Sequence, residues 1–442
     1  MLRMFLLALL GLALGLSTAS AQTREEKVRN DKKKIEAEGK WIYNDVPKAF
    51  AEAKKTGKPI VVVLRCLPCE ECVKLDDEII DADERIKPLL EKFVNLRVVS
   101  TNGLDLSLFQ FDTDQSFAVF FLREDGTIYG RFGTRSHRTN WLGDVSIEGL
   151  AKALQGGLDL HAGYPKNKDS LAAKRGPAPE FPVPEKFPAL SAKYTAKLNY
   201  EGNVVQSCIH CHQVGDAIRT FHRAKREPMP QEVLFPYPHP KSQGLILDPK
   251  EQATVKQVEP GSATEKSGFK AGDRIKALDG QPLLSIADVQ WVLHRASADG
   301  AKLRAEVLRD GKPLDLTFSL EKGWRQADDI SWRSSSWGLR AMATGGILFE
   351  EISEEERKKA GAPAEGMALR AKHVGQYGAH AAGKKAGFLN DDIVISWDGK
   401  TDLLRDTDVL AYGVLKRKPG DTIAVKVLRS GKTLEIKIPM QE

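Results

Sequence analysis

The hydrophobic pattern is clearest in the first third of the chain, where helical and strand spacings alternate. Apolar residues recur at intervals of three and four over residues 41–55, which predicts an amphipathic helix. Residues 60–64 are wholly apolar and rich in β-branched side chains, which indicates a strand buried on both faces. The other elements predicted for this part are helices over 72–93 and 147–158 and strands over 94–100, 117–122 and 127–132.

The chain begins with a pattern typical of exported proteins. Arg3 precedes an apolar run over residues 5–16, and small residues follow at 19–21, as at a signal-peptide cleavage site. The run is shorter than the roughly 20 apolar residues that a membrane span needs. We therefore expect a signal peptide over residues 1–21, no membrane span after its cleavage, a periplasmic or secreted location and a charged leader over residues 22–40.

The second half of the chain repeats itself. Residues 268–275 return as residues 387–394, and residues 308–312 return as residues 428–432. Two copies of one small module are the simplest interpretation of this spacing.

Length, charge and motifs limit the possible functions. A chain of 442 residues suggests about three domains. Its 66 basic and 60 acidic residues are spread along the sequence and leave a net charge of +6, so we expect no nucleic-acid binding. The sequence lacks the Gly-x-Ser-x-Gly and Gly-Asn-Ser-Gly-Gly nucleophile motifs of serine hydrolases, which predicts that the protein is not a protease.

Three of the five cysteines, Cys66, Cys69 and Cys72, follow the predicted strand over 60–64 directly. Together with Trp41, the Ala-Phe-Ala-Glu-Ala-Lys-Lys-Thr-Gly-Lys-Pro run over 49–59 and the order of the elements, they resemble exported thioredoxin-like domains. The resemblance implies that Cys69 and Cys72 form the redox pair and that Cys66 is additional.

The position of this pair at a predicted helix start supports a redox role. A thiol in the first turn of a helix faces unpaired N–H groups, which stabilise the thiolate. We therefore expect Cys69 to be the nucleophile and Cys72 the resolving thiol. A structural disulfide with a spare thiol is the alternative, and Phe117 favours it because thioredoxins carry a cis-proline there. Iron–sulfur ligation is disfavoured, because Asp76 stands where the fourth cysteine is needed.

The other two cysteines lie in the run Cys-Ile-His-Cys-His over residues 208–212, which is the attachment pattern of c-type haem. Cys208 and Cys211 would bond the haem, His212 would be its proximal ligand, and Met229 would be the distal ligand, with His222 as second choice. A zinc site formed by the same cysteines with His212 and His222, or a plain disulfide, is the alternative.

The repeated module also carries a recognisable pattern. The run Val-Glu-Pro-Gly-Ser-Ala over 258–263 and the Gly-Phe-Lys-Ala-Gly-Asp turn after it resemble the PDZ domains of bacterial periplasmic proteases. The resemblance implies that each copy binds the carboxyl terminus of a protein partner as an added strand, beside helices over 286–294 and 407–415. A packing or dimerisation module is the alternative. The carboxylate-binding loops that it implies are Gly244-Leu245-Ile246-Leu247 and Trp337-Gly338-Leu339-Arg340.

These features predict a multidomain fold. Its parts are an α/β thioredoxin-like domain, a Pro-rich linker, a short cytochrome c-like haem-attachment segment and two mainly β PDZ domains, over residues 41–163, 164–186, 187–240, 241–325 and 335–442. The whole arrangement resembles a family of exported bacterial thioredoxin-like/PDZ proteins that includes selenocysteine-containing members.

The functional expectation follows from the cysteines. We expect an exported thiol-disulfide oxidoreductase whose haem exchanges electrons with a partner and whose PDZ modules recruit client proteins by their C-termini. The alternative is a non-catalytic periplasmic binding or assembly scaffold with structural cysteines.

Overall fold

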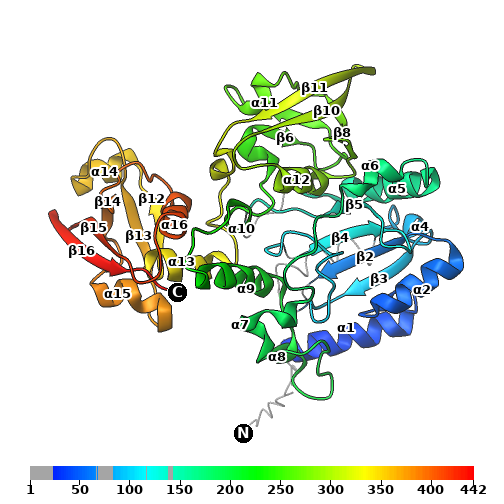
Figure 1. Ribbon diagram of the computed structural model, residues 1–442, viewed down its shortest axis with the longest axis horizontal. Helices are drawn as coiled ribbons and strands as arrows, with labels where there is room; N and C mark the ends of the chain where they lie inside the picture. Colours follow the sequence, from blue (N-terminus) through cyan, green and yellow to red (C-terminus); the bar gives the residue numbers. More distant parts are fainter. Residues whose placement is uncertain (1–22, 66, 68–82, 116, 138–142) are drawn as a thin grey trace, which may run out of the picture.

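The computed structural model describes residues 23–65, 67, 83–115, 117–137 and 143–442. The expected signal peptide and the cysteines Cys66, Cys69 and Cys72 lie outside these residues. The described chain forms an N-terminal α/β domain, two β-rich repeats and a group of short helices between them (Figure 1).

The N-terminal domain is built on a five-stranded sheet in the order β1-β3-β2-β4-β5. β1, β3 and β2 run parallel, whereas β4 and β5 are antiparallel to their neighbours. The predicted strands over 60–64, 117–122 and 127–132 are confirmed. The strands are β1 (Ile42–Tyr43), β2 (Ile60–Arg65), β3 (Val94–Val98), β4 (Phe117–Leu122) and β5 (Ile128–Phe132), and the helices include α2 (Val46–Thr56), α4 (Lys87–Leu90), α5 (Ile147–Gly163) and α6 (Lys168–Ala172).

The two faces of this sheet are covered by different helices. Val61 and Val63 of β2 pack in a cluster with Leu154 of α5, and Val62 and Leu64 pack in another with Ala53 of α2. All six residues of β2 are buried, as the continuous apolar run predicts, because the side chains of a strand alternate between two covered faces.

The charged leader is a helix docked on this domain. α1 (Arg24–Glu38) buries Val28 and Ile35, and its Asp31 accepts a hydrogen bond from Arg97 Nε of β3 at 3.2 Å. Its Glu25 accepts hydrogen bonds from the backbone N–H groups of residues 204 and 205, at 3.0 and 2.9 Å. Some of the charged side chains of this segment therefore form ion pairs and helix caps that hold α1 in place.

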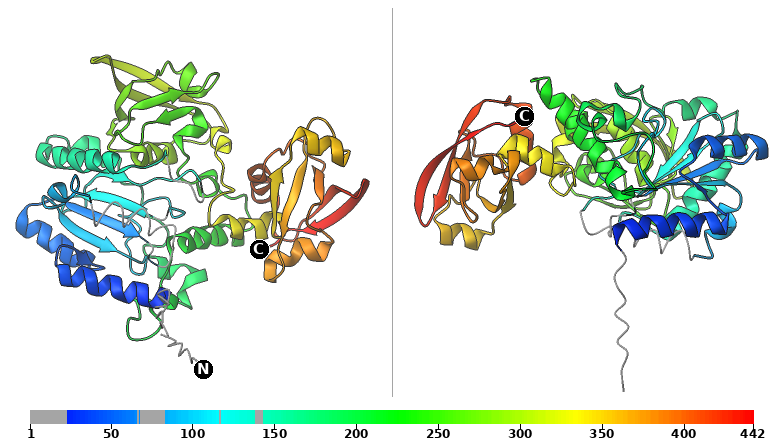
Figure 2. Two further views of the ribbon diagram at one scale, coloured as in Figure 1. Left: turned by 180° about the vertical axis from the view of Figure 1, so that it is seen from behind. Right: turned by 90° about the horizontal axis from the view of Figure 1, so that it is seen from below.

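The first repeat consists of two small sheets, β6-β7 and β11-β10-β8-β9. The second repeat is a single sheet in the order β12-β13-β14-β15-β16, at the end of the molecule away from the N-terminal domain (Figures 1 and 2). The elements of the first repeat are β6 (Leu245–Leu247), β7 (Val255–Val258), α11 (Ala263–Lys266), β8 (Arg274–Leu278), β9 (Gln281–Pro282), α12 (Ile286–Arg295), β10 (Ala301–Arg309) and β11 (Lys312–Leu320). Those of the second are β12 (Ile347–Glu351), α14 (Glu354–Ala360), β13 (Leu369–Val374), η4 (Gly378–Ala381), α15 (Ala382–Ala386), β14 (Ile393–Trp397), α16 (Asp406–Leu415), β15 (Thr422–Arg429) and β16 (Lys432–Pro439).

An ion pair recurs at the same place in both repeats. Arg309 donates to both carboxylate oxygens of Asp273 at 2.7 Å. Arg429 donates to both oxygens of Asp392 at 2.6 Å. Each arginine also donates to a glycine carbonyl, of residue 268 or 387. The sequence repeat is therefore also a repeat in three dimensions.

Short helices connect these parts. α9 contacts α13, and the two lie between the N-terminal domain and the second repeat (Figure 1). The connecting elements are η1 (Pro184–Lys186), α7 (Pro188–Ser191), α8 (Val204–Ser207), α9 (Cys211–Ala224), α10 (Gln231–Leu234), η2 (Pro240–Gln243), η3 (Trp324–Ala327) and α13 (Ser336–Thr344).

The first repeat is fixed to the N-terminal domain through α12. Lys174 and Asp288 form an ion pair at 2.9 Å, and both side chains are only 1% exposed. Trp291 Nε1 donates to the Ala173 carbonyl at 3.0 Å. An ion pair that is fully desolvated persists only where the surrounding structure holds both partners, so this interface is tightly packed.

Candidate functional site

One edge of β6 in the first repeat is open. Among the described residues β6 pairs with a single strand, β7. Glu259 N donates to the Gly244 carbonyl at 3.0 Å and Asp248 N to the Thr254 carbonyl at 2.8 Å, which turns the backbone of Ile246 toward β7. The N–H and C=O groups of Leu245 and Leu247 therefore face away from β7, and no described residue forms a hydrogen bond with them.

The turn before β6 requires glycine. Gly244 has φ +76°, and a Cβ there would collide with the side chain of Ser262. The preceding residue is held on both sides, because Thr264 Oγ1 donates to the Gln243 carbonyl at 2.7 Å and Gln243 Nε2 donates to the Trp324 carbonyl at 3.0 Å. This turn is held in a fixed conformation and leads directly into an open strand edge.

The helix beside this edge is held by the N-terminal domain. Val289 and Leu293 of α12 belong to the core of the first repeat. On its other side, Ser285 Oγ donates to the Arg131 carbonyl at 2.6 Å and Arg131 N donates to Asp288 at 3.2 Å. Because both sides are packed, the separation between α12 and β6 is set by the N-terminal domain as well as by the repeat itself.

The second repeat differs from the expectation. Residues 337–340, Trp337-Gly338-Leu339-Arg340, lie inside the helix α13, so their assignment to a carboxylate-binding loop is wrong. Leu339 packs against Leu410 and Val414 of α16 in one apolar cluster, which stabilises helical spacing in this segment. The turn equivalent to Gly244 is Gly345-Gly346, with φ +67° and +91°, directly before β12. Two adjacent glycines before the apolar run Ile-Leu-Phe were the signal that the sequence offered.

The equivalent edge of β12 is already occupied. Thr344 Oγ1 donates to the Ile347 carbonyl at 2.9 Å and accepts from Ile347 N at 3.1 Å. Phe349 N donates to Asp406 at 3.0 Å, and Arg340 pairs with the same carboxylate. The outward N–H groups that are unpaired in β6 are thus bonded to the chain itself in β12, as is the outward carbonyl of Ile347.

The segment with Cys208 and Cys211 lies against the N-terminal domain. Thr101, just after β3, donates to the Ile209 carbonyl through its N–H at 3.1 Å and its Oγ1 at 2.8 Å. Cys208 is 3% exposed, and burial raises the pKa of its thiol to about 11, so the thiol is protonated at neutral pH. Cys211 begins α9 and packs against the domain core beside β2 and β3.

The residues expected to hold a haem lie in different surroundings. A haem bonded to both sulfurs needs open space beside them, but Cys208 is buried and Cys211 packs against the core. His212 is half-exposed, with Nδ1 3.7 Å from Asp216. Met229 belongs to the apolar cluster of α10, α13 and α16, which contains none of the residues over 208–212. Haem attachment stays a prediction, which the absorbance spectrum of the exported protein tests.

The zinc alternative also lacks support from the geometry. Within the part of the chain that the structure describes, no group of three or more His, Cys, Asp or Glu side chains is placed to hold a metal ion. The expected catalytic residues Cys66, Cys69 and Cys72 lie outside that part.

One cluster of serine, histidine and aspartate lies between the N-terminal domain and η2. Ser136 Oγ donates to Asp144 at 2.8 Å, His239 Nε2 lies 3.6 Å from the same carboxylate, and Lys241 pairs with it at 2.5 Å. In a catalytic triad the histidine lies between the serine and the acid, whereas here the carboxylate lies between them. The histidine of this cluster is therefore not placed to accept the serine proton.

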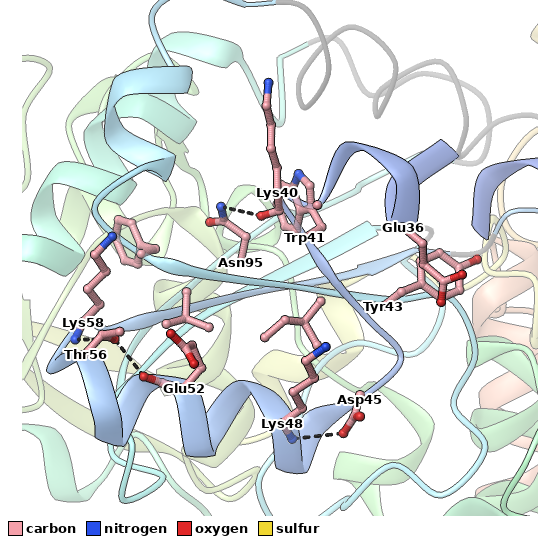
Figure 3. A pocket seen from close by; sticks show the side chains of 14 residues that line it. Glu36, Lys40, Trp41, Tyr43, Asp45, Lys48, Glu52, Thr56, Lys58 and Asn95 are labelled. Atoms are coloured by element: carbon pink, nitrogen blue, oxygen red, sulfur yellow. Dashed lines mark hydrogen bonds between the residues drawn. The ribbon is translucent and has the colours of Figure 1, made fainter. Parts of the chain in front are cut away.

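A polar depression lies beside Trp41 (Figure 3). Asn95 Nδ2 donates to the Lys40 carbonyl at 3.3 Å, and Lys58 Nζ donates to the Glu91 carbonyl at 2.8 Å. Its acidic and basic side chains balance, so it shows no preference for a charged ligand. They are Glu36, Asp45 and Glu52 against Lys40, Lys48 and Lys58.

Two family models match parts of this chain. Residues 41–123 match a thioredoxin-like model, and residues 239–320 match a PDZ domain model that spans the Gly244 turn, β6 and α12. The chain contains a thioredoxin-like domain and a PDZ domain. The first repeat is the PDZ domain, and its pairing with a thioredoxin-like fold agrees with the expectation from the sequence.

The most similar curated relatives include periplasmic proteases. The chain is 31% identical over 149 residues to the periplasmic pH-dependent serine endoprotease DegQ of Escherichia coli, over 34% of this chain and 29% of that protein. It is 41% identical over 90 residues to a probable periplasmic serine protease of Haemophilus influenzae, over 20% of this chain and 18% of that protein. The chain thus spans less than a third of the length of these relatives.

Solved structures of HtrA-type proteases also match parts of this chain, at lower sequence identity. The HtrA-type protease AlgW with a decapeptide is 12% identical, with a TM-score of 0.21, over 32% of this chain and 49% of that one. Among the helices of the described residues, none has both the length and the apolar composition needed to cross a bilayer.

These relatives correct the functional expectation. Periplasmic serine endoproteases are among the proteins that this chain resembles over about a fifth to a third of its length. These relatives contradict the expected thiol-disulfide oxidoreductase and the expectation that the protein is not a protease, and they favour a protease-type interpretation instead.

Proposed function

We propose that this chain acts in periplasmic protein degradation, where its PDZ domain binds the carboxyl-terminal end of a polypeptide along β6. The open backbone groups of Leu245 and Leu247 carry the proposal. A peptide added to this edge would pair its own backbone with them, which is how PDZ domains bind partners. The predicted signal peptide and the relatives' names support the periplasmic location.

The turn before β6 supplies the contact for the terminal carboxylate. Leu245 presents its N–H where the chain enters the strand, and Gly244, whose own N–H donates to the Lys241 carbonyl at 2.9 Å, leaves no side chain over it. An unpaired backbone N–H at the end of an open edge favours an anion. A free carboxyl terminus therefore fits the end of the groove better than an internal segment does.

Peptide binding measured by fluorescence anisotropy tests the proposal. A fluorescent peptide selected from a C-terminal library should bind saturably, and the same peptide with an amidated terminus should bind about tenfold more weakly, a loss of about 1.4 kcal/mol. Equal affinity of the acid and the amide would contradict carboxylate recognition.

A pair of glycine variants locates the site. Gly244→Val should abolish binding, because the side chain collides with Ser262 and distorts the turn. Gly261→Ala is the matched control, since Gly261 also has positive φ, +75°, but faces open space. Retained binding in Gly244→Val, with unfolding curves that show a folded domain, would place the site elsewhere.

Proteolysis by the chain itself is a second candidate, supported by the names of the relatives. Incubation with an unfolded protein such as casein tests for cleavage, and a fluorophosphonate probe tests for an activated serine. Cleavage without labelling would exclude a serine nucleophile, and the absence of both would leave peptide binding as the contribution of this chain.

A further inference from the structure

A separate apolar cavity of about 380 Å³ lies where the thioredoxin-like domain, the Pro-rich segment, α9 and the end of α12 meet. None of Cys208, Cys211 and His212 lines it, and neither does any residue of β6. It is therefore distinct from both the cysteine segment and the peptide edge. Its aromatic walls are Phe109, Phe111, Phe181, Phe187, Phe221 and Tyr237.

The walls of this cavity are held by direct contacts between segments that are distant in sequence. The ring of Phe181 lies 4.5 Å from that of Phe187 and 5.0 Å from that of Phe221 on α9, measured between centroids. Elsewhere in the lining, the rings of Tyr237 and His294 stack with their centroids 4.1 Å apart. Side chains that pack against one another in this way need little rearrangement to receive a ligand, so the site is preformed.

The part of the Pro-rich segment that lines the cavity is also fixed. Gln110 Nε2 donates to the Pro177 carbonyl at 2.9 Å, and Gln110 Oε1 accepts from Gly176 N at 2.7 Å. Both polar groups of this amide are satisfied within the protein. The wall that residues 177–181 form is therefore an ordered part of the cavity.

The buried charged groups that line the cavity, Asp114 and Arg219, are hydrogen-bonded within the protein. Asp114 accepts from Ser335 N at 2.8 Å and from Ser335 Oγ at 2.7 Å, and Arg219 donates to the same hydroxyl. Burial lowers the pKa of His222 and of His294, the latter to about 3, so both rings are neutral at neutral pH. A charged ligand would meet no unpaired buried charge of opposite sign here.

One polar group remains available. Tyr237 lines the cavity, and its hydroxyl forms no hydrogen bond with any described residue. A buried tyrosine usually finds a partner for its O–H, so an acceptor on a ligand would satisfy it.

We propose that this cavity binds a neutral, largely apolar small molecule that carries a hydrogen-bond acceptor for Tyr237. A volume of about 380 Å³ lies in the range of small-molecule sites, which are mostly apolar with a few polar groups that orient the ligand. The absence of an unpaired buried charge in the described lining argues for a neutral ligand, and the open hydroxyl argues for one acceptor.

The fluorescent molecule prodan, which is neutral and aromatic with one carbonyl acceptor, is the probe for the test. It should bind the full exported chain saturably with one site, and the anionic dye 8-anilinonaphthalene-1-sulfonate should bind about tenfold more weakly. Non-saturable binding of prodan, or tighter binding of the anionic dye, would overturn the proposal.

Two tryptophan variants on α9 test whether prodan binds in this cavity. Ile218→Trp fills the cavity from its α9 wall and should weaken prodan binding about tenfold or more. Thr220→Trp adds the same side chain at an exposed position of the same helix and should leave binding unchanged. Equal binding by Ile218→Trp and the parent chain would overturn the assignment.

Tyr237→Phe tests the polar contact separately. It keeps the aromatic wall and removes the hydroxyl, so prodan should bind several-fold more weakly while the unfolding midpoint and the PDZ–peptide affinity stay the same. Unchanged prodan affinity in Tyr237→Phe would remove the acceptor from the proposal, and a parallel loss of peptide binding would mean that the variant perturbs the fold instead.

Discussion

At the residue scale, the two repeats share an ion pair between a buried aspartate and a partly exposed arginine. Asp273 and Asp392 are 0% and 1% exposed, whereas their arginines are 26% and 29% exposed. Each arginine joins the end of the long hairpin to the turn that precedes β8 or β14. A carboxylate that is buried in this way depends on its partner, because its lost hydration is otherwise uncompensated.

Loss of this charge should destabilise the affected repeat. We expect Asp273→Asn to lower the free energy of unfolding by about 2 kcal/mol, because it weakens two charge-assisted hydrogen bonds to Arg309. Chemical denaturation followed by circular dichroism measures this loss. Arg304→Gln is the control, since its pair with Asp315 is exposed to solvent and contributes little to stability. Equal effects of the two variants would contradict this account.

A second prediction at this scale concerns pH. Burial raises the pKa of Asp328 to about 7. Arg333, whose Nη2 lies 3.9 Å away, lowers this pKa, whereas the charges of Asp112 and Asp329 raise it further. The folded state therefore holds a proton that the unfolded state releases above about pH 4. The contribution of Asp328 to stability is present at low pH and is lost as the pH rises toward 7.

Asp328→Asn isolates this contribution, because asparagine resembles the protonated acid at every pH. Relative to the parent chain, the variant should become more stable between pH 5 and pH 8 by at least about 1 kcal/mol. Urea midpoints of both proteins at the two pH values measure the difference. The histidines His239 and His294 act in the opposite direction in both proteins, because burial lowers their pKa to about 4 and about 3, so they cancel in this comparison. A difference that does not change with pH would show that Asp328 is ionised in the folded state throughout.

At the element scale, β6 and β12 hold the same place in two copies of one module but differ at their outer edges. In the first repeat the residue at the start of α12 is Ile286, which cannot accept a hydrogen bond through its side chain. In the second repeat Asp406 takes this place and accepts from Phe349 N. Together with Thr344, it closes the edge that a peptide would use.

This difference predicts one peptide site per chain. Isothermal titration with a C-terminal peptide should give a stoichiometry near one, and Gly244→Val should abolish it. Gly346→Val, the equivalent change before β12, should leave peptide affinity unchanged although a side chain there collides with the His380 carbonyl. Two sites per chain, or loss of binding in Gly346→Val alone, would show that the second repeat binds peptide.

At the scale of the whole molecule, the thioredoxin-like domain serves as a support for the PDZ domain. β5 lies against α12, and the buried pair of Lys174 with Asp288 crosses their interface. Two domains that share such a buried surface are expected to unfold together.

Gly130 provides the test of this coupling. A Cβ at Gly130 would lie 2.6 Å from Leu284 Cδ1 and 2.8 Å from Asp288 Oδ2, so Gly130→Ala should cost about 1–3 kcal/mol. In calorimetry the thioredoxin-like and PDZ domains should share one transition, which shifts to lower temperature in the variant. Gly163→Ala is the control, because the nearest atom to its Cβ would be Asn167 Nδ2, at 3.1 Å, and no residue of α12 is close. Separate transitions that respond independently would contradict the shared unit.

The sequence by itself determined the features that depend on neighbouring residues. The apolar run over 60–64 required a buried strand, and the repeated glycine turns and Arg–Asp spacing required two similar modules, as the sheets and ion pairs confirm. The motifs at 41–59 and 258–263 also identified the thioredoxin-like and PDZ folds. The function inferred from cysteine spacing was wrong, because a motif shows which chemistry its residues permit and not which one the protein uses.

Tertiary structure decided what depends on residues far apart in the chain. Whether Trp337-Gly338-Leu339-Arg340 forms a loop or a helix depends on α16, about seventy residues later, which supplies the apolar surface that stabilises α13. In the second repeat, Thr344 and Asp406 accept hydrogen bonds from the outer edge of β12 and close it. In the first repeat, no described side chain does this for β6, and its edge is open. The aromatic cavity likewise exists only because four distant segments meet. Local sequence sets hydrogen-bonding capacity and periodicity, but only packing determines which of those groups remain available to a ligand.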